Sequence, residues 1–348
     1  MNISSSAAIP AKIRTQFGKM LSKNDYDTLL RKKSVPEIAI FLKNQTEFSS
    51  ILENIQEMLI HRGQLENILR KGIYNKYCSL LKYTDDKKDN FYFYYIIKAE
   101  INQILNFILY INAGTPEKII IDLPMFLISK STFKITNLGN VKNFSQLLSV
   151  LLKTPYYDIL KDFENVNENN PNDYLSCEKK LMTYYYSKVL SMINKQFFGK
   201  EKKELCDVFL LEAELQNLST IFRLKHFYGA TSHDLEKYII PLSYKIKKGQ
   251  LNEIINAKTD EDLFNNIKKL NYARYGEINV EKHTFIENFV NNVEFHKLKR
   301  FMRFSIYPSV CLVSFICICN IEINNIITII EAVRYNSPHD EIEKLLIT

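Results

Sequence analysis

Two His-Asp dipeptides are the residues of this 348-residue chain with the clearest potential for metal chemistry. His233-Asp234 and His339-Asp340 resemble ligand pairs of some helical metal-dependent phosphohydrolases, which use further His and Asp ligands from neighbouring helices. Both dipeptides follow a serine, or serine and proline, where a helix is expected to start. An aspartate there can cap backbone N–H groups and lies near the positive end of the helix dipole. We therefore interpret both as helix caps, with a metal-dependent hydrolase as the alternative.

Three glutamates recur at intervals of about 110 residues, at Glu100, Glu214 and Glu322. Each is followed by an aliphatic residue, two polar residues and a second aliphatic residue. Paired carboxylates can act as general acid and base, but those two roles need different environments, which three equivalent copies do not provide. We predict structural carboxylates that bond to a neighbouring unit of the fold.

The composition also argues against catalysis. Nine glycines are few for a fold that cradles phosphates in glycine-rich turns, and no common nucleotide-binding, hydrolase or zinc-protease motif is present. Cys317 and Cys319 have no matching second pair with which to complete a zinc site. We predict no catalytic site, no cofactor, no metal and six reduced thiols.

The charge balance and the apolar segments suggest a folded chain without a membrane span. Lysine and arginine number 46 against 39 acidic residues, but the basic blocks are short, which favours a mixed solvated surface over a nucleic-acid site. Val310–Ile318 is shorter than the about 20 residues of a membrane span, so we expect a core helix. The aromatic run Phe91–Tyr95 could stack on nucleobases, but it precedes an apolar helix and we expect it in the core.

Apolar residues at helical spacing predict an all-α fold, with prolines between helices rather than inside them. The groups are Ile13, Phe17, Met20 and Leu21; Ile51, Ile55 and Leu59; Leu215, Leu218 and Phe222; and Ile323, Ile326, Ile327 and Ile330.

The glutamate pattern leads each time to a turn with helix-start chemistry, at Thr115-Pro116, Thr231-Ser232 and Ser337-Pro338. A second recurring pattern is a capped helix that leads to an aromatic residue, and it starts at Ser34, Asn143 and Thr259.

These recurrences predict quasi-repeats of about 110 residues. The expected divisions are 1–95 for a partial first repeat, 96–205 for the second, 206–320 for the third, and 321–348 for a half-unit that packs back on the others.

Taken in order, the patterns resemble the C subunit of bacterial and archaeal V/A-type rotary ATPases, which corresponds to the d subunit of the eukaryotic V-ATPase. The best stretch is Glu212–Tyr275, followed by Ser305–Ile347, and Leu21–Leu30 with Glu37-Ile38 also fits. The resemblance spans nearly the whole chain.

This resemblance implies three similar helical domains in a pseudo-threefold, funnel-like arrangement. It implies a non-catalytic subunit at the cytoplasmic face of the membrane, peripheral to it, that joins the central-stalk subunits to the proteolipid rotor ring and transmits torque for ion transport. It implies neither nucleic acid nor a cofactor as a partner. The alternative is an all-α interaction scaffold, a divergent copy that binds another partner.

The chain departs from the family where many relatives have an arginine directly after the glutamate motif. Ser219 and Ile327 occupy those positions, although Arg223 keeps a cation one helical turn on. We predict seven polar residues at contacts between repeats or on the socket surface, with a solvated helix face as the alternative for the asparagines and arginines. The seven are Glu100, Glu214, Asn217, Arg223, Arg303, Glu322 and Asn325.

Overall fold

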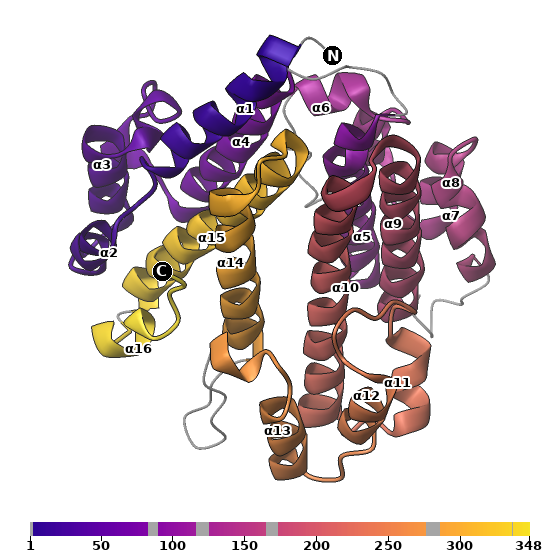
Figure 1. The fold of residues 1–348 in the computed structure, drawn as a ribbon. Coiled ribbons are helices and arrows are strands. Elements are labelled where there is room, and N and C mark those ends of the chain that lie inside the picture. The colour runs from indigo at the N-terminus through magenta and orange to yellow at the C-terminus, as the bar shows by residue number, and fades with distance from the viewer. Residues whose placement is uncertain (1–2, 83–89, 116–124, 165–172, 276–285, 336) are drawn as a thin grey trace. The chain divides into compact units, whose positions relative to one another are not determined.

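The computed structural model describes residues 3–82, 90–115, 125–164, 173–275, 286–335 and 337–348. Every regular element in these ranges is an α- or 3₁₀-helix, which confirms the all-α prediction for the described chain. The chain forms two compact units (Figure 1), residues 1–86 with 268–348, here called the terminal unit, and residues 87–267, here called the central unit. The predicted three repeats, their boundaries and their arrangement remain a prediction.

The terminal unit is built around the long helix α15, against which α1, α4 and α14 pack. Ser309–Ile316 of α15 are all buried, so the core position predicted for the apolar run is confirmed. The elements are α1 (Ile3–Phe17), α2 (Lys23–Leu30), α3 (Val35–Gln45), η1 (Glu47–Ser50), η2 (Glu57–Leu59), α4 (Arg62–Leu81), η7 (Ala273–Tyr275), α14 (Ile286–Phe304), α15 (Pro308–Tyr335) and α16 (His339–Glu343).

Helix α15 is longer than the apolar run alone suggested. Among the described residues it is the one helix whose length and composition would allow it to cross a membrane, and 78% of its most apolar 18-residue window is buried inside the structure. The core helix of a soluble protein meets the same criterion, and this burial agrees with a core role.

The central unit is built on three long helices, because α5 and α10 both pack against α9. The elements are η3 (Phe91–Phe93), α5 (Tyr94–Asn112), α6 (Met125–Lys130), η5 (Ile135–Asn140), α7 (Phe144–Leu151), α8 (Pro155–Leu160), η6 (Lys161–Phe163), α9 (Tyr174–Gln196), α10 (Gly199–Tyr228), α11 (Ser232–Tyr238), α12 (Lys248–Ile255) and α13 (Asp260–Lys268).

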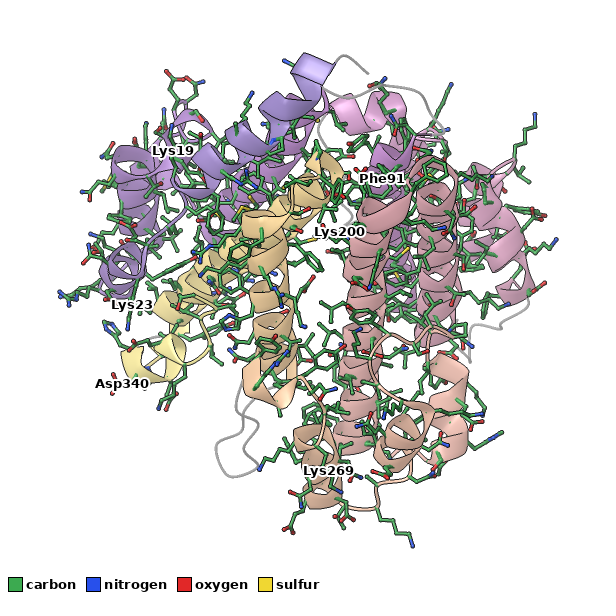
Figure 2. All side chains as sticks on the ribbon, viewed as in Figure 1. Lys19, Lys23, Phe91, Lys200, Lys269 and Asp340 are labelled. Carbon is green, nitrogen blue, oxygen red and sulfur yellow. The ribbon has the colours of Figure 1, made fainter. Side chains whose placement is uncertain are left out.

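The aromatic run that precedes α5 lies in the core of the central unit, as predicted. Phe91 is fully buried, stacks on Tyr94 with ring centroids 5.3 Å apart, and meets Phe197 and Phe209 edge-on. Lys200, at the start of α10 and labelled with Phe91 in Figure 2, is exposed by contrast. Burial of large aromatic rings is a main source of stability in a helical core.

The predicted helix starts after Ser34, Asn143 and Thr259 are confirmed. Each side chain accepts a hydrogen bond from the backbone N–H three residues later, which satisfies a donor that the helix leaves unpaired. Thr231 and Asp234 form a complete capping box at the start of α11, so the cap interpretation of the first His-Asp dipeptide is also confirmed.

The second His-Asp dipeptide differs from the prediction. Helix α16 begins at His339 with Pro338 as its N-cap residue and no side-chain cap, because Ser337 lies one residue too early to serve. Asp340 is in the first turn of α16, where its charge is favourable to the helix dipole. The turn predicted at Thr115-Pro116 lies outside the described residues from Pro116 onward.

Two further expectations are wrong. Ile51–Leu59 does not form the expected α-helix: Ile51–Gln56 is irregular, and Glu57–Leu59 is the 3₁₀-helix η2. Leu59 is 74% exposed, so the segment lacks the continuous buried face that stabilises a short helix. Pro10 lies inside α1 rather than between helices. A proline there removes one backbone hydrogen bond of the helix.

Gly229 ends α10 with a backbone conformation that disfavours other residues. Its φ is +59°, and its N–H donates to the carbonyl of Lys225. We expect Gly229→Ala to lower the free energy of unfolding by about 1 kcal/mol, because a Cβ strains this left-handed conformation. Urea unfolding measures this, with Gly249→Ala in α12 as the control. A Cβ at Gly249 meets no atom within 4 Å, so a loss of stability there equal to that at Gly229 would contradict the explanation.

Candidate functional site

Five of the seven predicted site residues are buried polar side chains on the long helices α5, α10 and α15. These are Glu100, Glu214, Asn217, Glu322 and Asn325, each between 0% and 4% exposed. A buried carboxylate or amide is costly unless hydrogen bonds satisfy it. The described structure brings backbone groups of other segments to these side chains.

Glu214 on α10 gathers three consecutive backbone N–H groups. Its Oε1 accepts from Tyr244 at 2.8 Å, Lys245 at 3.0 Å and Ile246 at 2.9 Å, and its Oε2 accepts from Lys245 at 3.0 Å. The loop before α12 has no regular structure of its own at this point, so the carboxylate supplies the acceptors that its backbone needs. Hydrogen bonds to an ionised acceptor are stronger than neutral ones.

Glu100 on α5 holds the corresponding loop with different donors. Its Oε1 accepts from the Ser131 hydroxyl at 2.7 Å and from the Thr132 N–H at 2.5 Å. Its Oε2 accepts from the Thr132 hydroxyl at 3.2 Å and from the Tyr156 hydroxyl at 2.6 Å. Burial raises the pKa of Tyr156 well above its usual value, and the nearby Glu100 charge raises it further. Tyr156 therefore stays protonated and serves as a donor.

Glu322 on α15 is the least satisfied of the three carboxylates. Its Oε1 accepts from the Leu21 N–H at 2.7 Å, and its buried Oε2 has no hydrogen-bond partner among the described atoms. Burial raises the pKa of Glu322 to about 7, although the charge of Lys76 opposes that rise. Lys76 is itself bonded to Glu47, so its charge is shared between two carboxylates.

The two asparagines three residues after Glu214 and Glu322 repeat one geometry. The Asn217 amide donates to the carbonyl of Ile240 at 2.9 Å and accepts from its N–H at 2.8 Å. The Asn325 amide donates to the carbonyl of Ile347 at 2.7 Å and accepts from its N–H at 3.0 Å. It also donates to the Tyr26 hydroxyl at 3.2 Å. Each amide thus fixes one residue of a returning segment through both of its backbone groups.

The two arginines among the predicted residues are exposed. The Arg223 charge lies near Glu178, where it opposes the rise in the Glu178 pKa that burial causes. Arg303 lies over the ring of Phe17, 5.9 Å from its centroid. The prediction that the seven residues lie at interfaces between repeats or at a socket remains a prediction, because each hydrogen bond described above falls within a single compact unit.

The two histidines considered as metal ligands lie on different helices, α11 and α16. His233 and His339 are both exposed, and no cluster of three or more His, Cys, Asp or Glu side chains with the spacing of a metal site occurs among the described residues. All six cysteines are free thiols, as predicted, and Cys319 is buried in α15.

Sequence reasoning identified the helix residues but not their partners in the loops. The second recurring pattern predicts an aromatic residue after the helix that starts at Asn143, but it gives no sign that the Tyr156 hydroxyl donates to Glu100. The ends of the bonds at Leu21, Tyr244 and Ile347 carry no side-chain signal, because backbone atoms make the contacts. The repeated spacing itself was the available signal, since a loop follows Glu100 and Glu214 at a similar distance.

The described structure is an all-α protein in which buried carboxylates and amides on long helices hydrogen-bond to other segments of the chain. The model of a family described as ATP synthase (C/AC39) subunit matches residues 9–345, and the chain belongs to this family.

Similar proteins carry a matching description. The chain is 24% identical to the C subunit of the A-type ATP synthase of Methanosarcina acetivorans over 246 residues, which are 69% of this chain and 64% of that protein. It is 21% identical to the C subunit of the A-type ATP synthase of Methanosphaera stadtmanae over 347 residues, 97% of this chain and 86% of that protein. The first of these matches spans less than two thirds of the relative's length.

Removal of the Glu214 carboxylate tests the anchoring role. We expect Glu214→Ala to lower the free energy of unfolding by about 3 kcal/mol or more, because three backbone N–H groups lose the carboxylate that accepts their hydrogen bonds. Urea unfolding gives the total effect, and amide hydrogen exchange at Tyr244–Ile246 gives the local one. Glu236→Ala, an exposed change in the same unit, is expected to alter neither. Unchanged protection at Tyr244–Ile246 in Glu214→Ala would contradict the anchoring role.

The raised pKa of Glu322 predicts a pH-dependent cost. The folded-state pKa of about 7 lies above the unfolded value of 4.5, so the folded state holds the proton more tightly, and ionisation destabilises it as pH rises through this window. Glu322→Gln keeps an acceptor for Leu21 but cannot ionise. Its stability relative to the unchanged protein is expected to increase by about 3 kcal/mol between pH 4.5 and pH 7, measured by urea unfolding. A stability difference that is constant with pH would refute this.

Proposed function

We propose that this protein is a non-catalytic coupling subunit of a V/A-type rotary ATPase. In this role it seats the central stalk on the proteolipid ring of the membrane, at the cytoplasmic face, and transmits torque between them. The family match over residues 9–345 is the observation that carries the proposal, and the relatives are named as C subunits of A-type ATP synthases. The funnel-like, pseudo-threefold arrangement of repeats belongs to the same proposal.

The buried anchors support a mechanical role. A part that transmits torque must keep its loops fixed relative to its helices under load. Charge-assisted hydrogen bonds in a low-dielectric interior resist such displacement, because each broken bond leaves a buried charge or donor unsatisfied. Glu214 holds its loop through four such bonds, and Glu100 holds its loop through three and Tyr156 of α8 through a fourth.

Exposed aromatic and aliphatic side chains at two helix junctions are candidates for the contacts with other subunits. Phe198, at the junction of α9 and α10, is 78% exposed, whereas the adjacent Phe197 packs against Phe91. Phe304 and Ile306, at the junction of α14 and α15, are 78% and 76% exposed. Large apolar side chains at such exposure favour burial against a partner.

The alternative function, an all-α scaffold for an unrelated partner, would use the same exposed residues. A pull-down of the tagged protein from its native membranes in mild detergent, followed by mass spectrometry, separates the two. The coupling role predicts proteolipid and central-stalk subunits in stoichiometric amounts. Recovery of the protein alone, or with an unrelated partner, would exclude the coupling role.

The same pull-down tests the exposed junctions. We expect Phe198→Ser and Phe304→Ser each to weaken the interaction by about tenfold, because each removes one large apolar side chain from a contact. Leu152→Ser, at a 53% exposed position away from both junctions, is the matched control and is expected to have no effect. Full recovery of partners by the double variant would rule out these contacts without affecting the coupling proposal.

A further inference from the structure

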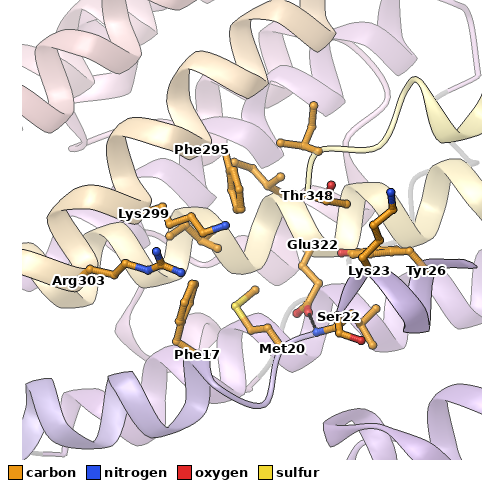
Figure 3. A pocket seen from close by; sticks show the side chains of 14 residues that line it. Phe17, Met20, Ser22, Lys23, Tyr26, Phe295, Lys299, Arg303, Glu322 and Thr348 are labelled. Atoms are coloured by element: carbon orange, nitrogen blue, oxygen red, sulfur yellow. Dashed lines mark hydrogen bonds between the residues drawn. The ribbon is translucent and has the colours of Figure 1, made fainter. Parts of the chain in front are cut away.

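A pocket in the terminal unit combines cationic and apolar walls. It has a volume of about 320 Å³ and is formed by the end of α1, the start of α2 and the turn between them, by α14, by the middle of α15, and by Ile347 and Thr348. Figure 3 shows Lys299 and Arg303 on one side of it and Phe17 and Met20 beside them. Ligand pockets usually start at about 300 Å³, so the space suffices for a small ligand or for the head of a larger one.

The cationic wall follows from the sequence of α14. Phe295, Lys299 and Arg303 are four residues apart and therefore lie on one face of the helix, toward the pocket. Lys299 lies 4.7 Å from the centroid of the Phe295 ring, and Arg303 lies 5.9 Å from that of Phe17. The aromatic rings hold both cations at the boundary between the apolar wall and the open space.

The two cations lack an acidic counterpart. No ion pair joins Lys299 or Arg303 to a carboxylate in the part of the chain that the structure describes. Burial lowers the pKa of Lys299, and the neighbouring Arg303 lowers it further. The protonated form of Lys299 is therefore destabilised by partial burial and by repulsion from Arg303. An anion in the pocket would offset that cost.

The other charged side chains that line the pocket are Lys23 and Glu322. Lys23 lies 3.9 Å from Glu343, and Glu322 accepts the Leu21 N–H through Oε1. Arg14 donates to the carbonyl of Ser305 at 2.9 Å, which ties the end of α14 to α1 without neutralising Arg303. The one acidic side chain among the described residues that line the pocket, Glu322, therefore forms no ion pair with the cations of α14.

We propose that this pocket binds a phosphate group that is joined to an apolar chain. The guanidinium of Arg303 and the ammonium of Lys299 contact the phosphate, for which the planar, multi-donor guanidinium is well suited. Phe17, Met20 and Phe295 contact the apolar chain. The ligand is either a soluble phosphate ester or the head of a phospholipid, which share this chemistry. The binding does not depend on assembly with other subunits.

Calorimetric titration of the full chain tests the proposal with two probes, a short-chain phosphatidic acid below its micelle concentration and inorganic phosphate. We expect saturable 1:1 binding of the phosphatidic acid, at least about tenfold tighter than that of inorganic phosphate, because burial of a few methylene groups contributes more than about 1.4 kcal/mol. Equal affinity for the two probes would remove the apolar part of the proposal, and no saturable binding would overturn it.

Variants on α14 identify the site. Lys299→Glu with Arg303→Glu is expected to abolish binding of the phosphatidic acid, and Arg300→Glu, an exposed charge reversal on the same helix, is expected to leave the dissociation constant unchanged within about twofold. An equal loss in Arg300→Glu would mean general charge attraction and would refute the pocket. Should the double reversal not fold, as judged by circular dichroism, Lys299→Gln with Arg303→Gln replaces it.

Co-sedimentation with phosphatidylcholine vesicles that contain phosphatidic acid distinguishes the two sources of the ligand. Vesicle binding that the double reversal abolishes and Arg300→Glu retains would identify a membrane phospholipid. Binding of the short-chain probe without vesicle binding would identify a soluble ester. Vesicle binding that both variants retain, together with no binding of the short-chain probe, would place any lipid contact outside this pocket and would overturn the proposal.

Discussion

A carboxylate placed inside a helical core must be surrounded by donors, and this constraint organises the loops of the protein. Helices satisfy their own backbone groups, whereas the loops between them do not. Here the buried glutamates lie where loops return to the long helices. The loop supplies the hydrogen-bond donors that the buried carboxylate requires, and the carboxylate supplies acceptors for the N–H groups of the loop. A loop anchored in this way needs no strand pairing, which fits a fold whose described regular elements are all helical.

The three glutamates show how one requirement is met to different degrees. Glu214 accepts from three backbone N–H groups, and Glu100 accepts from hydroxyl donors together with one N–H. Glu322 has the Leu21 N–H and partial compensation from Lys76. Glu322 thus has the same sequence pattern as the other two glutamates but fewer hydrogen-bond donors around its carboxylate.

The sequence predicted the helical class, the caps at Ser34, Asn143 and Thr259, and the burial of the aromatic run, because each depends on local residues or on periodicity. It failed at Ile51–Leu59, where spacing alone suggested a helix but the fold offers no surface to cover the whole segment. It also could not place the partners of the buried glutamates. Those contacts are made largely by backbone atoms far away in the chain, and no side-chain pattern records them.

Two hydrogen bonds have a consequence for how the protein is made. Glu322 and Leu21 are separated by 301 residues, and Asn325 and Tyr26 by 299. During synthesis the first helices of the terminal unit must therefore wait for α15, while the central unit lies between them in the chain and is complete before α15 emerges. Contacts of such long range slow folding, and they leave the apolar faces of the first helices uncovered in the interval. The N-terminal segment is thus the part of the nascent chain with the greatest need of protection by a chaperone.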